Sequence, residues 1–156
     1  MGERTALDCL INFCRCVIDV FGARYLRRPN DADTQRLLQM HEDKHGFPEM
    51  LGSLDCMHWE WRNCPVAWKG QYTRGSHGIY PEWAAFVKSF PCPEDPKRKK
   101  LKERQESARK DVERAFGVLQ ARWTIIRGPA RSYYKNDLKN IMYTCIILHN
   151  MIIEDE

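Results

Sequence analysis

The sequence has no long hydrophobic run and no secretion signal. Its 156 residues are 43% hydrophobic and 29% charged, which is ordinary for a globular protein of one domain. No stretch approaches the roughly 18 apolar residues that indicate a membrane span. Residues 1–5 lead directly into an amphipathic stretch and lack the continuous apolar core of a signal peptide. These absences predict an intracellular protein without a membrane partner.

Paired cysteine motifs are also absent. The seven cysteines are an odd number and form no Cys-x-x-Cys pair, so reduced thiols are a better interpretation than a disulfide scaffold. A zinc site built from Cys56, His58, Cys64 and His77 is an alternative, but its spacing matches no standard zinc pattern. The sequence therefore argues against a zinc ribbon and a thiol redox motif.

Basic residues are present, but they are unevenly distributed. The net charge is +4, whereas residues 97–131 hold 12 Lys or Arg and 4 Asp or Glu, so that 12 − 4 = +8 lies in this segment. Such a block indicates a surface that contacts a polyanion, a nuclear import signal, or a solvated helix face. Its first cluster is predicted as a nucleic-acid contact and consists of Lys97, Arg98, Lys99, Lys100 and Lys102.

Apolar spacing and capping residues predict a mostly helical chain. A Thr5–Asp8 capping box and Gly22 are expected to bound the first helix. Met50 to Trp61 lacks a helical cap and predicts a buried strand. Loop is expected for residues 62–81, and further helices are expected over residues 30–46, 82–90, 97–123 and 137–153.

Two carboxylates suggest chemistry. Asp55 lies in the apolar run predicted as a strand, and Glu113 lies at the edge of the apolar face of a long helix. Two such groups can converge on Mg²⁺ or Mn²⁺, which prefer oxygen ligands. The alternative is structural: Asp55 caps a turn, and Glu113 pairs with Arg109 or Lys110 on its own helix.

Several blocks of the chain resemble plant PIF/Harbinger transposases and their host-domesticated, nuclease-like relatives. The first block, Phe47 to Trp59, contains Gly52-Ser53-Leu54-Asp55. The others are Asn63-Cys64-Pro65, Ala67-Trp68-Lys69-Gly70, Gly78-Ile79-Tyr80-Pro81-Glu82-Trp83, the run from Gln105 to Leu119, and the tail from Asp137 to Glu156. Together these blocks cover most of the chain.

This resemblance implies an RNase H-like DDE domain that cuts DNA with three carboxylates and a divalent metal. It makes Asp55 the first Asp and Glu113 the closing Glu. The second Asp should stand directly before Gly78, where this chain has His77. The family also carries a long segment between the blocks, and residues 71–77 are too few to hold its strands. His77 as a replacement metal ligand is the less favoured alternative to a deletion junction.

The fold expected from the resemblance is therefore a truncated α/β domain of RNase H-like descent, mostly helical with a small residual β element. Residues 1–46 would form an N-terminal helical region, and residues 47–156 a partial DDE endonuclease domain with a deletion near 71–77. Nuclease activity is expected to be lost. The alternatives are a non-catalytic protein-interaction module, or an active nuclease if the deletion is a gene-model error. The resemblance implies DNA and a Myb-like DNA-binding protein as partners. It places the chain in the nucleus, with the cytoplasm as the alternative.

Three tryptophans allow two interpretations. Trp59, Trp61 and Trp68 can stack on nucleic-acid bases or pack in a core, which is the commoner use of such side chains. His149 is predicted to lie among the core residues of the last helix.

Overall fold

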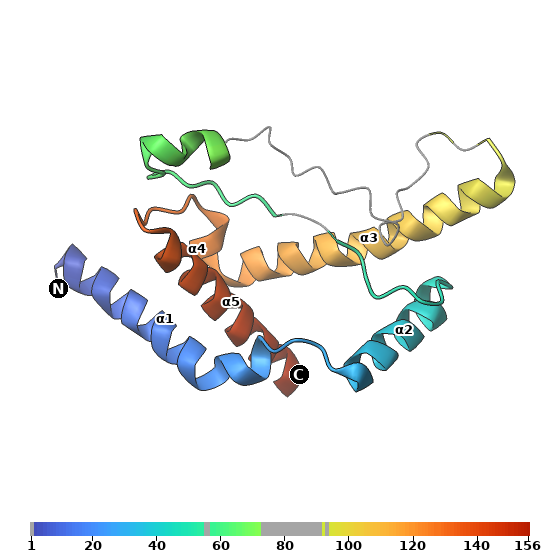
Figure 1. Cartoon of the computed structure of the whole chain (residues 1–156), viewed down its shortest axis with the longest axis horizontal. Helices are drawn as coiled ribbons and strands as arrows, with labels where there is room; N and C mark the ends of the chain where they lie inside the picture. Colours follow the sequence, from blue (N-terminus) through green and yellow to red (C-terminus); the bar gives the residue numbers. More distant parts are fainter. Residues whose placement is uncertain (1, 55–56, 73–91, 93) are drawn as a thin grey trace. The chain divides into compact units, whose positions relative to one another are not determined.

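A computed structural model describes residues 2–54, 57–72, 92 and 94–156 of the chain. Figure 1 shows its helices in chain order. They are α1 (Glu3–Tyr25), α2 (Asp31–His45), the 3₁₀-helix η1 (Val66–Tyr72), α3 (Pro96–Arg122), α4 (Thr124–Arg127) and α5 (Lys135–Asp155). None of the described helices is long and apolar enough to cross a membrane.

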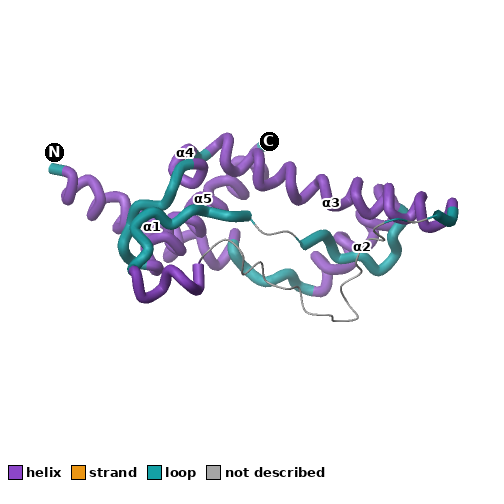
Figure 2. The backbone as a smooth tube through the Cα atoms, turned by 90° about the horizontal axis from the view of Figure 1, so that it is seen from above, coloured by secondary structure: helices purple, strands orange, loops and turns teal. Residues whose placement is uncertain are grey.

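The described residues contain helices and loops but no strand, as Figure 2 shows. The strand predicted over 50–61 is wrong for the described part of that segment. Its β character is limited to an isolated parallel bridge between Trp61 and Ala130. A strand needs a neighbouring strand to satisfy its backbone groups, and a pattern of apolar residues cannot supply one. The prediction of a mostly helical chain is confirmed.

The ends of α1 differ from the prediction. The helix begins at Glu3 with Gly2 as N-cap, so Thr5 and Asp8 lie inside the first turns and do not form its capping box. It also passes through Gly22 and ends at Tyr25. A glycine inside a helix costs only about 1 kcal/mol relative to alanine, and the contacts of α1 with α5 outweigh this cost.

Helix α2 follows the prediction closely. Asn30 forms a capping box with Asp33, in which each side chain accepts a hydrogen bond from the backbone N–H of the other residue. Gly46 ends the helix in the left-handed conformation, with φ of 68°. A Cβ at Gly46 would lie 2.5 Å from Nη1 of Arg104. The guanidinium of Arg104 ends a flexible side chain and can move, so it is the left-handed backbone that favours glycine at this position.

The described residues fall into two compact units. The first consists of Met1–Arg28, His58–Lys69 and Gly117–Glu156, and it contains α1, α4 and α5. In Figure 1, α5 lies beside α1, and Thr144 on α5 donates a hydrogen bond to the backbone oxygen of Cys14 on α1. The core of this unit comprises Ile11, Cys14, Leu119, Ile126, Ile141 and Cys145, with Trp59 and Trp123 packed against it.

The second unit consists of Pro29–Met57 and Gly70–Phe116, and it contains α2 and most of α3. Its buried residues include Ala108 on α3 and two histidines on α2, His41 and His45. Few apolar side chains are buried among the described residues of this unit. Its described contacts are mostly polar and join α2 to α3.

The long helix α3 is confirmed to within about a residue at each end. Its buried residues include Ala108 and Leu119. The last helix is also confirmed, and its buried residues are Ile141, Thr144, Cys145 and Ile147. The helix predicted over 82–90 lies outside the described residues. Helices η1 and α4 were not predicted.

Candidate functional site

Glu113 lies in the middle of α3 and pairs with the residue one turn before it. Its carboxylate is 3.1 Å from the guanidinium of Arg109, and the two side chains are 44% and 63% exposed. A pair of Glu113 with Arg109 was predicted from the sequence as the structural alternative to a metal site. An exposed pair of this kind contributes only about 0.3–0.5 kcal/mol.

The other residues of the predicted metal site are only partly described. Asp55, Cys56 and His77 lie outside the described residues. Cys64 is buried and its thiol lies 3.6 Å from the backbone oxygen of Pro65, whereas His58 is exposed. Within the described ranges, no group of three or more His, Cys, Asp or Glu side chains could hold a metal ion.

The segment that follows Asp55 is fixed to the loop after α4 by a row of hydrogen bonds. Trp59 Nε1 donates to the backbone oxygen of Gly128 at 2.8 Å, and Trp61 Nε1 donates to that of Ser132 at 2.7 Å. The backbone N–H of Ala130 donates to the oxygen of Glu60 at 2.7 Å. Because Trp59 also packs against the core, core packing is the correct interpretation for this tryptophan.

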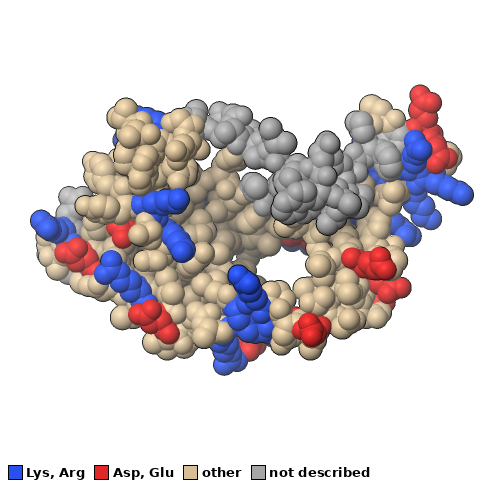
Figure 3. All heavy atoms as spheres, viewed as in Figure 1, with Lys and Arg blue, Asp and Glu red and all other residues tan. Residues whose placement is uncertain are grey.

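Basic side chains gather at the beginning of α3, as Figure 3 shows. Residues 97–100 are all exposed, and Lys102 is partly buried. Asp95 accepts a hydrogen bond from the backbone N–H of Arg98 at 3.2 Å, but the first turn of the helix has no acidic residue. Cations at a helix N-terminus face the positive end of the helix dipole. The cluster is therefore a concentrated positive surface, suited to contact with a polyanion.

A histidine cluster between α2 and α3 was not predicted. The rings of His41 and His45 stack with their centroids 5.6 Å apart, and His45 Nε2 lies 3.1 Å from Oδ2 of Asp111. Lys44 donates to the same oxygen at 2.7 Å and holds the pKa of the Asp111 carboxyl below its usual value. The i,i+4 spacing of the two histidines was the sequence signal that could have found this cluster.

His41 makes the second unit sensitive to acid. Burial, assisted by His45, lowers the pKa of His41 from its usual value; Lys44 acts in the same direction and Asp111 opposes it. Its Nδ1 is buried and makes no hydrogen bond. As the pH falls through about 6.5, His41 therefore binds a proton in the unfolded chain before it does so in the folded chain. The folded form loses stability from that pH downward.

We expect the thermal unfolding midpoint to fall between pH 7.5 and pH 5.5, and to fall less in His41→Leu. Leucine is neutral at both pH values and fills a similar buried space. His58→Leu is the matched control because His58 is exposed. An equal pH dependence in wild type and His41→Leu would contradict the assignment to His41.

His149 is partly buried on α5 and interacts with the end of α3. Its Nδ1 lies 3.0 Å from Nη1 of Arg122, which also approaches Glu156. Burial and the adjacent Arg122 lower the pKa of His149. The predicted position among core residues is thus partly correct, since the ring is only half buried and faces a guanidinium.

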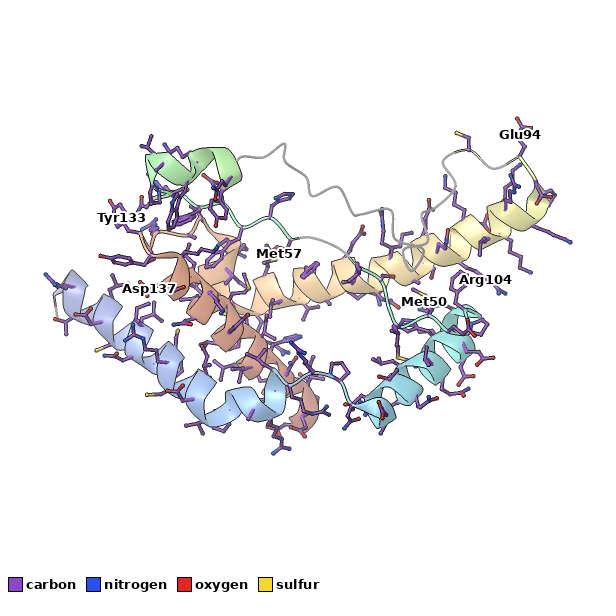
Figure 4. All side chains as sticks on the ribbon, in the orientation of Figure 1. Met50, Met57, Glu94, Arg104, Tyr133 and Asp137 are labelled. Carbon is purple, nitrogen blue, oxygen red and sulfur yellow. The ribbon has the colours of Figure 1, made fainter. Side chains whose placement is uncertain are left out.

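Exposed aromatic side chains surround a shallow pocket in the first unit. The pocket is lined by Pro65, Trp68, Tyr133, Tyr134, Lys135 and Asn136. Trp68 is tilted against Trp61, with ring centroids 6.0 Å apart, and Tyr133 lies on the loop before α5 (Figure 4). Unlike Trp59, Trp68 leaves much of its ring accessible.

The described residues thus form a helical protein with a basic cluster at the start of α3 and an exposed ion pair between Arg109 and Glu113. The family model described as plant transposon protein matches residues 23–78 and residues 76–156. These two matches cover most of the chain, and the chain therefore belongs to the plant transposon protein family. No curated protein and no solved structure matches it.

Proposed function

We propose that this chain is a PIF/Harbinger-type transposase-derived protein, descended from an RNase H-like DDE endonuclease, that no longer cuts DNA. The motif blocks around Asp55 and Glu113 support this ancestry. Membership of the plant transposon protein family is consistent with it.

The main support for the loss of nuclease activity is the junction between the block that ends at Gly70 and the block that begins at Gly78. The first family match ends at residue 78 and the second begins at residue 76. The resemblance places a missing part of the sheet in the same region, at residues 71–77. His77 occupies the position expected for the second Asp. A match in two parts that meet at this point supports an internal deletion. A deletion of this kind removes both a ligand and the strands that hold it.

The remaining residues fit a metal site poorly. Mg²⁺ or Mn²⁺ in such a nuclease activates water and stabilises the leaving oxygen of a phosphodiester. Asp55 and Glu113 are the two proposed ligands that remain. Glu113 is paired with Arg109 and exposed, whereas a metal site needs carboxylates held together on a rigid support.

DNA binding can be retained after cleavage activity is lost, because binding depends on positive charge rather than on the carboxylates. We propose Lys97, Arg98, Lys99, Lys100 and Lys102 as the residues that contact phosphates. The exposure of residues 97–100 at the beginning of α3 supports this assignment, and Lys102 is partly buried beside them. The proposal includes a nuclear location and a Myb-like DNA-binding partner, both inherited from the PIF/Harbinger type.

A nicking assay tests the loss of activity. With supercoiled plasmid and either Mg²⁺ or Mn²⁺, we expect wild-type protein to nick DNA no faster than Asp55→Ala or Glu113→Gln. We also expect His77→Asp to remain inactive, because one restored carboxylate does not restore the missing strands. Metal-dependent nicking by wild type that disappears in Asp55→Ala would show that the site is complete.

Sequencing of the transcript across codons 74–78 tests the junction itself. We expect a continuous reading frame from Arg74 to Gly78. An additional exon that ends in an Asp codon directly before Gly78 would overturn the deletion and restore the enzyme as the function.

A further inference from the structure

Helix α1 carries a second apolar stripe in addition to its core face. The stripe follows the alternating spacing of three and four residues along 18 residues of the helix and consists of Ala6, Cys9, Phe13, Cys16, Val20 and Ala23. All six residues are exposed, and the side chains of Phe13 and Val20 are among the exposed large hydrophobic ones. Such spacing is the a/d pattern of a coiled-coil seam.

The stripe is separate from the face that packs on α5. Ile11, Cys14 and Val17 are the buried residues of α1, and at 100° per residue their face lies about a third of a turn from the stripe. The polar residues Asp8 and Arg15 lie on the remaining side. Figures 1 and 2 both show the first turns of α1 extending beyond α5 within the first unit. The stripe is thus open to a partner helix.

We propose that a second copy of this chain covers the stripe, and that the two α1 helices form a parallel two-stranded coiled coil. Phe13 and Val20 occupy a positions, and Cys9 and Cys16 occupy d positions. In a parallel pair each of these residues packs against its own equivalent across the two-fold axis.

Charge at the edges of the stripe favours the parallel arrangement. Asp19 occupies a g position and Arg24 an e position five residues later. A parallel pair therefore contains two equivalent contacts, each between Asp19 of one copy and Arg24 of the other. Arg24 also donates to Glu154 at 2.6 Å, but a guanidinium has five N–H donors and can serve both carboxylates. An antiparallel pair would place g against g and would separate Asp19 from Arg24.

The size of the helix limits the strength of the dimer. A helix of 23 residues is about 34 Å long. One pair of helices of this length buries less than the roughly 1,600 Å² of a standard interface. We therefore expect a reversible dimer that dissociates on dilution through the micromolar range.

Sedimentation equilibrium of the full chain tests the dimer. We expect a concentration-dependent dimer in wild type and a dissociation constant at least about 100-fold higher in Phe13→Glu, which buries a charge in the seam. Val118→Glu is the matched control, because Val118 is an exposed apolar residue on α3. A wild-type monomer at all concentrations would overturn the proposal, as would equal weakening by Val118→Glu.

Charge reversal tests the parallel register. Asp19→Arg should weaken the dimer about three- to tenfold by replacing two attractive pairs with repulsive ones. Asp8→Arg makes the same change at a c position, outside the seam, and should have no effect. Equal effects of the two variants would contradict the register.

Oxidation of the thiols gives a second measure of orientation. Diamide, which accepts the two hydrogens released when a disulfide forms, should link Cys9 to Cys9 and Cys16 to Cys16 of two copies. The double variant Cys9→Ser/Cys16→Ser, which keeps the exposed Cys92, should form no such link. Peptide mapping identifies the bonds. Links through Cys92 alone, or between Cys9 and Cys16, would overturn the parallel coiled coil.

Discussion

Replacement of Ile126 with alanine is expected to lower the free energy of unfolding by roughly 3–5 kcal/mol. Ile126 is fully buried, with 0% exposure, in the core of the first unit. It lies on α4, a helix of only four residues, between the end of α3 and the loop before α5. The shortened side chain leaves a cavity that the neighbouring helices can fill only in part.

Ile125→Ala is the matched control for this prediction. It makes the same chemical change one residue earlier, where the side chain is 41% exposed, and it should cost less than about 1 kcal/mol. Urea denaturation followed by circular dichroism measures both variants. A cost of Ile126→Ala no larger than that of Ile125→Ala would mean that α4 does not belong to the core.

Trp59→Ala is expected to be similarly destabilising, at roughly 3–5 kcal/mol. The ring packs against the core, and Nε1 donates to the backbone oxygen of Gly128. Trp59→Phe keeps most of the buried ring but leaves that oxygen without its donor, at a cost of about 1–3 kcal/mol. The difference between the two variants separates packing from hydrogen bonding.

The same denaturation experiment on Trp68→Ala provides the control. Trp68 is 42% exposed and lies beside Trp61, so its removal should cost about 1 kcal/mol. If Trp68→Ala were as destabilising as Trp59→Ala, the assignment of Trp59 to the core and of Trp68 to the surface would be wrong.

The helices were largely predictable from the sequence because their signals are local. Asn30 and Asp33 cap the second helix, and Gly46 ends it, through contacts between residues a few positions apart. The strand over 50–61 was wrong because strand formation depends on a distant partner. In the described part of that segment, a loop near Ala130 supplies only a single bridge.

The candidate site was predictable only in part, for the same reason. The pair of Glu113 with Arg109 could be named from its i,i+4 spacing. The i,i+4 spacing of His41 and His45 was visible in the sequence, but the contact of His45 with Asp111 was not predictable, because these two residues lie 66 positions apart.

The sequence by itself determined the helical character of the chain, the basic cluster at the start of α3 and the membership of a transposon family, because each depends on residue order alone. The apolar face of α1 that contains Ile11, Cys14 and Val17 follows from helical spacing, but only the tertiary structure decided that α5 covers it. Both stripes have helical spacing, and the packing of α5 covers Ile11 and Cys14 but leaves Phe13 and Val20 exposed. Burial depends on which neighbour approaches a helix, and periodicity cannot specify that neighbour.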